Sequence, residues 1–565
     1  MKSLPLVLSA LLPMATLIAK PAQHPTYEPD GAPLGKPVAT ATAQGTRLIP
    51  VSMRQRFNRD VLSGLPQRAT AIVLRGWKGE TVQTQVLVEA PEGIQTLSAK
   101  SRKGTFEVHP VRYTTGNGVL LPDIIDHFDE QTFKGVVRPL LLSCTIPLDA
   151  KTAQSDILEV KVNETTLTLP VTILSAGATL PAPEHWAFHL DLWQHPDAAA
   201  RWHDVPMWSE EHLAVLAPQL RYLANMGQKT ITCTLVDEAW QGQTYDHFRS
   251  MIQVTKTAEG TWAYNFSAFD TWATFALKFF KQNQATLNCY TMIPWSLTFP
   301  YTDAATGTVV KPKLVPGTPE YEAFWGPYLT ALVAHLKEKG WLDITRIAMD
   351  ERPDHLLKPA LELVSKYAPM LKIVAACDHP SAINRNFQDV SYAYDHCEKL
   401  IAELPDRKAQ GKTTTFYTCL HPLRPNTLMY SDLAESEWMI PMAAHYGLDG
   451  MLRWAFHSWE ENPFMSMDHV RFPTGDTAMM YPGDRASLRL AAIRNGIETY
   501  EKIRILRAEA ARQQKSEALA PLEKALAQFT VARGKEAGIH EADLIALDTA
   551  LYQATEALFP NQTQK

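Results

Sequence analysis

Two neighbouring acids, Asp350 and Glu351, have the residue types and the spacing that acid–base chemistry requires. They follow an apolar run over residues 344–349, and a stretch of helical character over residues 354–367 comes next. A β/α barrel presents its catalytic groups in this way, at strand ends that lead into helices. Two carboxyls this close cannot both ionise freely, so their pKa values separate and the pair supplies an acid and a base near neutral pH. A helix cap beside a solvated loop acid is the alternative explanation.

The chain around this pair alternates between predicted strands and predicted helices from residue 184 to residue 507. Apolar runs predict eight strands, at residues 186–192, 229–236, 286–294, 344–349, 372–377, 390–394, 413–419 and 449–454. A 3.6-residue period predicts further helices at residues 210–226, 268–280, 320–339, 435–446 and 485–507. Eight strand–helix units predict an α/β fold, a (β/α)8 barrel of the TIM type. An open, doubly wound sheet is the alternative, although no glycine-rich phosphate loop follows any strand.

Other patterns flank the predicted barrel. Residues 46–175 contain short β-branched runs separated by turn residues, which predicts an N-terminal β-sandwich that supports the barrel or faces a carbohydrate. Residues 20–45 are rich in Pro, Ala, Gly and Thr and are expected to form a flexible lead-in. Residues 508–565 are rich in Ala, Glu, Leu and Lys and are expected to form a short helical extension.

The first nineteen residues have the pattern of a secretory signal peptide. Met1, Lys2 and Ser3 give a basic start, and an apolar stretch runs from Leu4 to Ala19, where a small residue marks the expected cleavage point. The stretch contains two prolines and is too short for a comfortable membrane span. We therefore expect an exported protein, in the periplasm, on the cell surface or outside the cell, with no transmembrane segment once the signal is removed.

The composition excludes several classes of function. Hydrophobic residues make up 45% of the chain and charged residues 20%, as in a soluble globular protein. A formal net charge of −6 argues against nucleic acid or an anionic membrane as the main partner. The six cysteines are dispersed and none has the spacing of zinc ligands. Mostly buried thiols are therefore expected, with no structural metal and no cofactor.

Acids and aromatic residues gather at the predicted ends of the strands. Aromatic faces pack well against sugar rings, and acids in the same place transfer protons, so the combination indicates glycosidase chemistry. The residues expected to bind substrate are His189, Asp191, Trp193, Trp295, Asp378, Tyr394, Tyr417, Trp454, His457 and Trp459. Taken singly, a tryptophan at a strand end is more often a core residue, and His189 and His457 are better explained as structural histidines, so the argument rests on convergence from eight strands. Asp237 and Glu238, after the second strand, form a rival catalytic pair.

Several runs along the predicted barrel carry a recognisable pattern. They are Pro206-Met207-Trp208-Ser209-Glu210-Glu211-His212, Met349-Asp350-Glu351, Gly450-Met451-Leu452-Arg453-Trp454-Ala455-Phe456, Gly475-Asp476, Tyr481-Pro482-Gly483, Ser487-Leu488-Arg489 and Arg494-Asn495-Gly496-Ile497-Glu498-Thr499-Tyr500-Glu501. These runs resemble glycoside hydrolase family 123, whose layout also includes a preceding β-sandwich. The block from residue 475 onward is the most specific. One departure is Asn495, where the family pattern leads us to expect an acid.

Resemblance to this family implies an exo-acting β-N-acetylgalactosaminidase that retains configuration by substrate-assisted catalysis. It implies that Glu351 is the general acid/base, while Asp350 orients the 2-acetamido group, whose carbonyl oxygen attacks C1 to form an oxazolinium intermediate. The local chemistry agrees, because two acids on one strand end cannot straddle a sugar ring as a double-displacement pair must. The candidates for an aromatic wall around the sugar are Trp454 first, then Tyr394, Tyr417 and Trp295.

Two other functions fit the same residues. A β-N-acetylglucosaminidase, or another β-hexosaminidase, differs in the geometry of one substrate hydroxyl, and no residue of the sequence reveals which geometry is selected. A secreted carbohydrate-binding protein without catalysis also fits an aromatic-rich barrel, although the intact Asp350 and Glu351 argue against it. The expected partner is a glycan with terminal β-linked N-acetylgalactosamine, and no oligomeric state is predicted.

Overall fold

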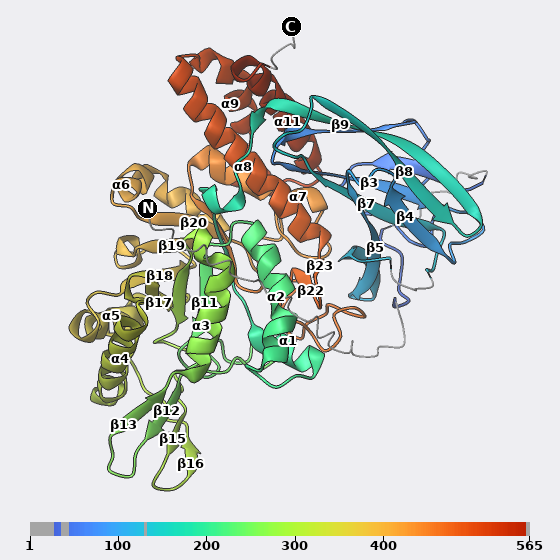
Figure 1. The fold of residues 1–565 in the computed structure, drawn as a ribbon. Helices are drawn as coiled ribbons and strands as arrows, with labels where there is room; N and C mark the ends of the chain where they lie inside the picture. Colours follow the sequence, from blue (N-terminus) through green and yellow to red (C-terminus); the bar gives the residue numbers. More distant parts are fainter. Residues whose placement is uncertain (1–27, 36–44, 129–132, 561–565) are drawn as a thin grey trace, which may run out of the picture.

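The computed structural model describes residues 28–35, 45–128 and 133–560, and an eight-stranded parallel sheet forms its centre (Figure 1). The strands are β10 (His189–Leu192), β11 (Thr230–Thr234), β14 (Thr286–Tyr290), β17 (Thr345–Met349), β18 (Lys372–Cys377), β19 (Asp389–Ala393), β20 (Thr413–Tyr417) and β21 (Gly450–Arg453). Their order along the sheet is β10, β21, β20, β19, β18, β17, β14, β11. A parallel bridge between Leu190 and Gln228 joins the two end strands, so the sheet curls into a barrel.

Helices follow most of these strands and cover the outside of the barrel. They are α1 (Pro196–His203), α2 (Glu210–Asn225), α3 (Ser267–Phe280), α4 (Pro319–Lys339), α5 (Asp354–Tyr367), α6 (Leu404–Ala409), α7 (Leu433–Tyr446) and α8 (Leu488–Gln513). Ser209, Thr318 and Ser487 cap α2, α4 and α8, each accepting a hydrogen bond from the backbone N–H three residues on. Gly447 ends α7 with a φ of 79°, which glycine adopts without strain.

All eight barrel strands predicted from the sequence are present, with ends that differ by a few residues at most. The helices predicted over residues 210–226, 268–280, 320–339 and 435–446 correspond to α2, α3, α4 and α7. The helix predicted over 485–507 is α8, which begins and ends later. The fold is therefore the predicted α/β barrel, and the open doubly wound sheet is excluded.

A small four-stranded sheet projects from the barrel rim at which the strands end (Figure 1). In spatial order it consists of β13 (Trp262–Asn265), β12 (Gln253–Lys256), β15 (Tyr301–Asp303) and β16 (Thr308–Val310). These strands belong to the loops after β11 and β14. The sequence does not predict them, because three- and four-residue strands carry too short a hydrophobic pattern.

The predicted β-sandwich precedes the barrel. One of its sheets contains, in spatial order, β1 (Arg47–Val51), β3 (Thr81–Glu89), β7 (Val137–Thr145), β5 (Glu107–Gly116) and β6 (Val119–Ile125). The other contains β2 (Ile72–Lys78), β9 (Thr165–Thr179), β8 (Ala153–Val162) and β4 (Leu97–Ser101). Their inner faces share one buried core, to which Leu74 and Val171 contribute from one sheet and Val86 and Leu140 from the other.

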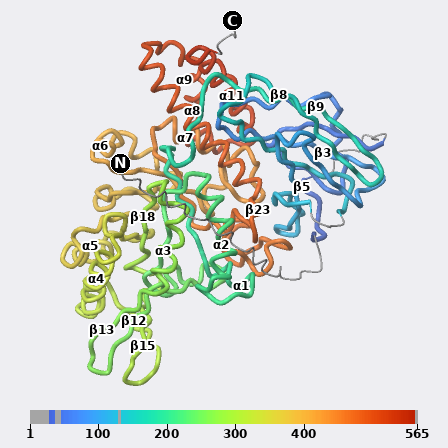
Figure 2. The backbone as a smooth tube through the Cα atoms, in the orientation of Figure 1, coloured from blue at the N-terminus to red at the C-terminus, as the bar shows by residue number. Residues whose placement is uncertain are grey.

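Three further helices follow α8 and pack on the barrel side, and the last of them, α11, also lies against the sandwich (Figure 2). They are α9 (Ala520–Leu526), α10 (Val531–Gly534) and α11 (His540–Leu558). The Trp77 indole N–H donates to Thr555 Oγ1 of α11 at 3.1 Å. The Arg75 guanidinium lies over the Tyr552 ring of the same helix at 4.1 Å. The helical extension thus connects the barrel to the sandwich.

The predicted lead-in is described only over residues 28–35. Within it, Glu28 is fully buried and pairs with Arg59 at 2.9 Å and with Arg138. This part of the segment is held against the sandwich, in contrast to the flexible lead-in expected there. The signal peptide predicted at residues 1–19 lies outside the described residues. None of the helices in the described ranges combines the length and the apolar composition that a bilayer crossing requires.

Candidate active site

Asp350 and Glu351 lie at the end of β17, where the chain leaves the barrel and leads into α5. The strand is buried from Ile347 to Met349, so these acids are the first polar side chains to reach the rim. Asp350 is 9% exposed and Glu351 is half-buried. The structure thus places the pair where catalytic groups of a β/α barrel occur.

Trp295, which follows β14 on the neighbouring strand, fixes the position of Asp350. Its indole N–H donates to Asp350 Oδ2 at 2.6 Å. The guanidinium of Arg352 lies over the Trp295 ring at 3.9 Å and donates through Nε to the Ile293 carbonyl at 3.0 Å. An indole held on one face by a cation has little rotational freedom, so the carboxylate that it contacts is held as well.

Burial and local contacts act on the pKa of Asp350 in opposite directions. Burial raises its pKa, because a low-dielectric surrounding penalises the charge. The hydrogen bond from Trp295 and the charge of Arg352 oppose that rise and lower the pKa, but burial is the larger effect. An acid in this balance forms strong hydrogen bonds and responds to any charge that develops beside it.

Glu351 has the raised pKa that a general acid requires. Burial first and the neighbouring Asp350 second raise its pKa to about 7. Tyr417, at the end of β20, donates its phenolic hydrogen bond to Glu351 Oε1. That bond lowers the pKa, because it stabilises the carboxylate, while the charge of the exposed Asp378 after β18 raises it. The residue is thus poised to give and take a proton near neutral pH.

Trp454 directly follows β21 and is held in place by Asp476 and Phe472. Its indole N–H donates to Asp476 Oδ1 at 3.3 Å, and its ring packs on Phe472 at 4.9 Å between centroids. Asp476 is fully buried and forms an ion pair with Arg453 at 2.9 Å. Trp454 itself is half-buried. Its ring is therefore fixed by a buried acid while part of it stays accessible.

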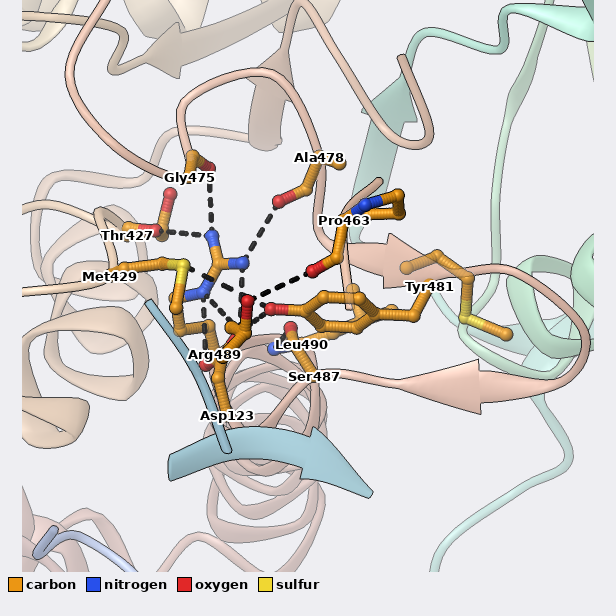
Figure 3. A network of polar contacts seen from close by, with 12 residues as sticks. Asp123, Thr427, Met429, Pro463, Gly475, Ala478, Tyr481, Ser487, Arg489 and Leu490 are labelled. Carbon is orange, nitrogen blue, oxygen red and sulfur yellow. Dashed lines mark hydrogen bonds and ion pairs between the residues drawn. The ribbon is translucent and has the colours of Figure 1, made fainter. Parts of the chain in front are cut away.

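The loop that carries Asp476 is fastened to the sandwich through Arg489 (Figure 3). Arg489, on α8, donates to the carbonyls of Gly475 at 2.8 Å and Ala478 at 2.9 Å, and pairs with Asp123 of β6 at 2.9 Å. Burial raises the pKa of Asp123, but the charges of Arg489 and Arg56 and the hydrogen bonds from Arg489 and Tyr481 together outweigh it, and the net pKa is lowered. The sandwich thus supplies the counter-charge for the arginine that positions this loop.

An aromatic floor lies beneath the rim. Trp193 is 3% exposed and packs on Tyr290 at 4.5 Å and on Trp240 at 5.1 Å. The charge of Asp350 raises the pKa of Tyr290, which indicates that this floor lies close to the acid pair, although burial is the main cause. Trp193 therefore belongs to the interior of the barrel beneath the pair.

Two predicted site residues of β10 lie deeper than the sequence indicates. His189 is the first residue of this strand, at the end of the barrel opposite the rim, and lies 3.6 Å from Asp389, the first residue of β19. Asp191 is buried inside the barrel, where it accepts a hydrogen bond from Thr230. Burial raises the pKa of Asp191 to about 6. The strand begins later than predicted, so its polar residues point inward below the rim.

Three other predicted residues lie in the protein core. The Tyr394 hydroxyl donates to the Val531 carbonyl of α10 at 3.4 Å, behind the barrel. The Trp459 indole N–H donates to the Met480 carbonyl at 2.6 Å, and its side chain is fully buried. His457 is also fully buried, and burial lowers its pKa to about 3. All three side chains are buried and do not reach the surface of the site.

The rival pair, Asp237 and Glu238, serves to hold a loop together. His247 bonds to Asp237 at 2.9 Å and lies 3.0 Å from Glu238, which also accepts a hydrogen bond from the Phe248 N–H at 2.9 Å. The partners of both acids belong to the same loop. Over residues 28–35, 45–128 and 133–560, no group of three or more His, Cys, Asp or Glu side chains is placed to hold a metal ion.

Paired acids of unequal environment, set among tryptophan and tyrosine at the rim of a parallel barrel, define a barrel-type glycoside hydrolase. Residues 193–506, more than half of the chain, match the family model of the glycoside hydrolase 123 catalytic domain. The chain therefore belongs to glycoside hydrolase family 123.

One solved structure shares the fold. A family 123 glycoside hydrolase from Clostridium perfringens, studied for glycolipid glycan hydrolysis, has a TM-score of 0.80 and 22% identity over 91% of this chain and 98% of its own. Two more distant structures carry no argument. A Bacteroides ovatus xyloglucanase has a TM-score of 0.31 and 7% identity over 76% of this chain and 99% of its own. A Thermotoga petrophila endo-β-1,4-mannanase has a TM-score of 0.33 and 11% identity over 57% of this chain and 78% of its own. No curated protein matches the chain.

The sequence does not assign roles to two residues that the site depends on. Arg352 directly follows the acid pair, and this position was the only feature of the sequence that pointed to its role of holding Trp295. Asp476 belongs to the specific late block, but nothing in its local pattern connects it with Trp454. Both contacts join loops that are distant in sequence.

Proposed function

We propose that this protein is an exo-acting, retaining glycosidase that removes terminal β-linked N-acetylgalactosamine by substrate-assisted catalysis. The observation that carries the proposal is the difference in environment between the two acids. Asp350 is buried and held by Trp295, whereas Glu351 is more accessible, has a pKa of about 7 and contacts Tyr417. Two acids from one strand end reach the same side of a sugar, which suits a reaction whose nucleophile belongs to the substrate.

In the first step Glu351 donates its proton to the glycosidic oxygen while the bond from C1 to that oxygen breaks. The carbonyl oxygen of the 2-acetamido group forms the new bond to C1 and yields an oxazolinium ion. The Asp350 carboxylate accepts a hydrogen bond from the acetamido N–H and stabilises the positive charge that develops on that group. In the second step Glu351 takes a proton from water as that water attacks C1 and the bond from C1 to the acetamido oxygen breaks. The acetamido group and the original configuration are thereby restored, and the carboxylic acid is regenerated.

The aromatic side chains at the rim supply the binding surface. Trp454 is half-buried and fixed by Asp476, so it presents a rigid face on which the sugar stacks. Tyr417 contacts Glu351 and lies on the opposite side of the acid pair from Trp295. A rigid aromatic surface costs little entropy when the sugar binds.

The glycan and the place of action are also part of the proposal. The Clostridium perfringens relative is described as acting on glycolipid glycans, and a glycan that ends in β-N-acetylgalactosamine is proposed here. The basic and apolar start of the chain supports export to the periplasm, the cell surface or the medium.

Hydrolysis of paired p-nitrophenyl glycosides tests the proposal. Turnover of the β-N-acetylgalactosaminide, well above that of the β-N-acetylglucosaminide and blocked by the matching thiazoline, is the expected result. A preference for the β-N-acetylglucosaminide would contradict the proposed specificity but not the proposed mechanism. Activity that the thiazoline does not inhibit would refute neighbouring-group participation.

A further inference from the structure

Arg453 is the last residue of β21, and its side chain is fully buried at the rim end of the barrel. Its Nη1 donates to the Thr418 carbonyl at 2.7 Å, and its Nη2 pairs with Asp476 Oδ1 at 2.9 Å. A guanidinium holds its N–H donors in one rigid plane, so a single side chain keeps two acceptors at set positions. Arg453 therefore ties the end of β20 to the loop that carries Asp476.

The bond to Thr418 reaches the acid pair through Tyr417. Thr418 directly follows Tyr417, which is the last residue of β20 and donates a hydrogen bond to the Glu351 carboxylate. A carbonyl that accepts from a charged donor is held more firmly than one that accepts from a neutral donor. Arg453 thus fixes the backbone from which the phenol extends toward Glu351.

The bond to Asp476 reaches the aromatic face of the site. Asp476 Oδ1 accepts from Arg453 and also from the Trp454 indole N–H, which lies at 3.3 Å. Because both donors share one oxygen, the position of this carboxylate relative to Arg453 sets the direction of the indole. The backbone joins Arg453 to Trp454 directly, so the three residues form a closed ring of contacts with little freedom to move.

Cys419 shows that the two sets of contacts lie close together. Burial first, and the charges of Asp476 and Glu351 after it, raise the pKa of this half-buried thiol to about 11. The influence of a charge falls with distance, so both acids lie near this thiol. Arg453 therefore lies where the acid pair and the aromatic face meet.

A buried arginine on a barrel strand can also serve stability alone, and Arg407 of α6 is an example. It donates to the Thr413 carbonyl at 2.9 Å and to Thr414 Oγ1 at 2.7 Å. Both partners lie at the start of β20, at the end of the barrel opposite the rim. Arg453 holds the other end of the same strand, one residue from the phenol that contacts Glu351.

We propose that Arg453 positions both halves of the site, the phenol that contacts Glu351 and the indole of Trp454. The inference rests on the proposed function, in which Glu351 donates the proton and Trp454 stacks on the sugar. Arg453 is fully buried, so it acts through these groups and does not meet the sugar itself. One side chain thereby keeps the proton donor and the sugar-binding face in a fixed relation.

Arg453→Lys tests the proposal, because it retains the charge but has a single nitrogen and cannot hold both acceptors in place. The Tyr417 contact lowers the pKa of Glu351, so loosening it should move the basic limb of the kcat/KM profile to higher pH. A shift of about half a pH unit is expected, as for a hydrogen bond partly lost. KM for an aryl β-N-acetylgalactosaminide should rise about fivefold as the indole loses its orientation.

Double variants separate positioning from a general loss of structure. In a Tyr417→Phe background, Arg453→Lys should move the basic limb no further but should still raise KM. In an Asp476→Asn background it should still move the limb but should raise KM no further. Residues that act through one another show such non-additive effects, whereas independent losses of stability add.

Arg407→Lys is the matched control and should leave both the basic limb and KM unchanged. If Arg453→Lys does not fold, Arg453→Gln combined with Asp476→Asn removes both buried charges together. The limb of that double variant should move, whereas the limb of Asp476→Asn alone should not.

Three results would overturn the proposal. They are an unchanged limb and KM in folded Arg453→Lys, effects that add in full in both double variants, and equal effects of Arg407→Lys. A wild-type protein that hydrolyses no β-N-acetylhexosaminide would instead refute the proposed function and, with it, this role of Arg453.

Discussion

Tyr417 and Glu351 meet across the mouth of the barrel, the phenol at the end of β20 donating a hydrogen bond to the carboxylate at the end of β17. Two strands, β18 and β19, lie between them in the sheet. The contact stabilises the charged form of Glu351 and so lowers its pKa, against burial and Asp350, which raise it. The balance between these effects sets the proton affinity of the proposed acid/base.

The first prediction concerns the pH dependence of the wild-type protein and of Tyr417→Phe. Glu351 must be protonated to donate, so kcat/KM should fall as pH rises through about 7. Tyr417→Phe removes a bond that lowers the pKa, and the basic limb of the profile should move to higher pH. Profiles on one aryl glycoside measure this, and a shift to lower pH would contradict the assigned role.

Asp350→Asn should act in the opposite direction on the same profile. It removes the neighbouring charge that raises the pKa of Glu351, so the basic limb should move to lower pH. The rate should also fall by roughly two to four powers of ten, because stabilisation of the developing acetamido charge is lost. A mild loss of rate would show that an acid other than Asp350 orients the acetamido group.

Glu351→Gln should separate bond cleavage from binding. The variant cannot donate a proton, so turnover of a natural disaccharide should be abolished, while a dinitrophenyl glycoside, whose leaving group needs little protonation, should retain more activity. Thiazoline affinity should stay close to the wild type. Glu362→Gln, at an exposed acid on α5, is the matched control and should be indistinguishable from the wild type. Disaccharide turnover at the wild-type rate by Glu351→Gln would end the assignment.

Asp476→Asn should change sugar binding through Trp454. The substitution weakens the acceptor for the indole N–H and removes the partner charge of Arg453. We expect KM for aryl β-N-acetylgalactosaminides to rise about tenfold, while the basic limb of the pH profile stays near 7, because Asp476 does not set the pKa of Glu351. A displaced basic limb would show that the loop acts on the acid pair directly.

The junction between sandwich and barrel should be sensitive to Asp123→Asn. The change leaves the fully buried Arg489 without its counter-charge, and loss of one partner from a buried ion pair costs about 3–5 kcal/mol. Urea unfolding followed by tryptophan fluorescence should show a clearly lowered midpoint. Glu517→Gln, on the exposed surface before α9, should leave the midpoint unchanged. Equal midpoints for both variants would show that the pair contributes little.

The barrel was predictable because its strands are apolar runs with turn residues on both sides, a pattern that local sequence carries in full. The acid pair was predictable because both members are adjacent in the chain. Trp295 illustrates the limit. Its type and position identified it as a rim residue, but its indole N–H bonds to Asp350, which follows a different strand. Contacts of this kind arise only when two loops are brought together by the closed sheet.

The height of a residue along its strand and the direction of its side chain were harder to predict. His189 belongs to the start of β10 and lies far from the rim, because the strand begins three residues later than its apolar pattern suggests. Tyr394 follows β19 at the correct level, but its side chain turns outward to α10. Periodicity locates a strand, but it does not reveal where the strand begins or which side chains turn outward.

The contact of α11 with the sandwich has a consequence for the order of events during synthesis. Trp77 and Thr555, which it joins, are 478 residues apart in sequence. The ribosome completes the sandwich strands long before α11 emerges, so this contact between the sandwich and α11 forms only after the whole barrel has been synthesised.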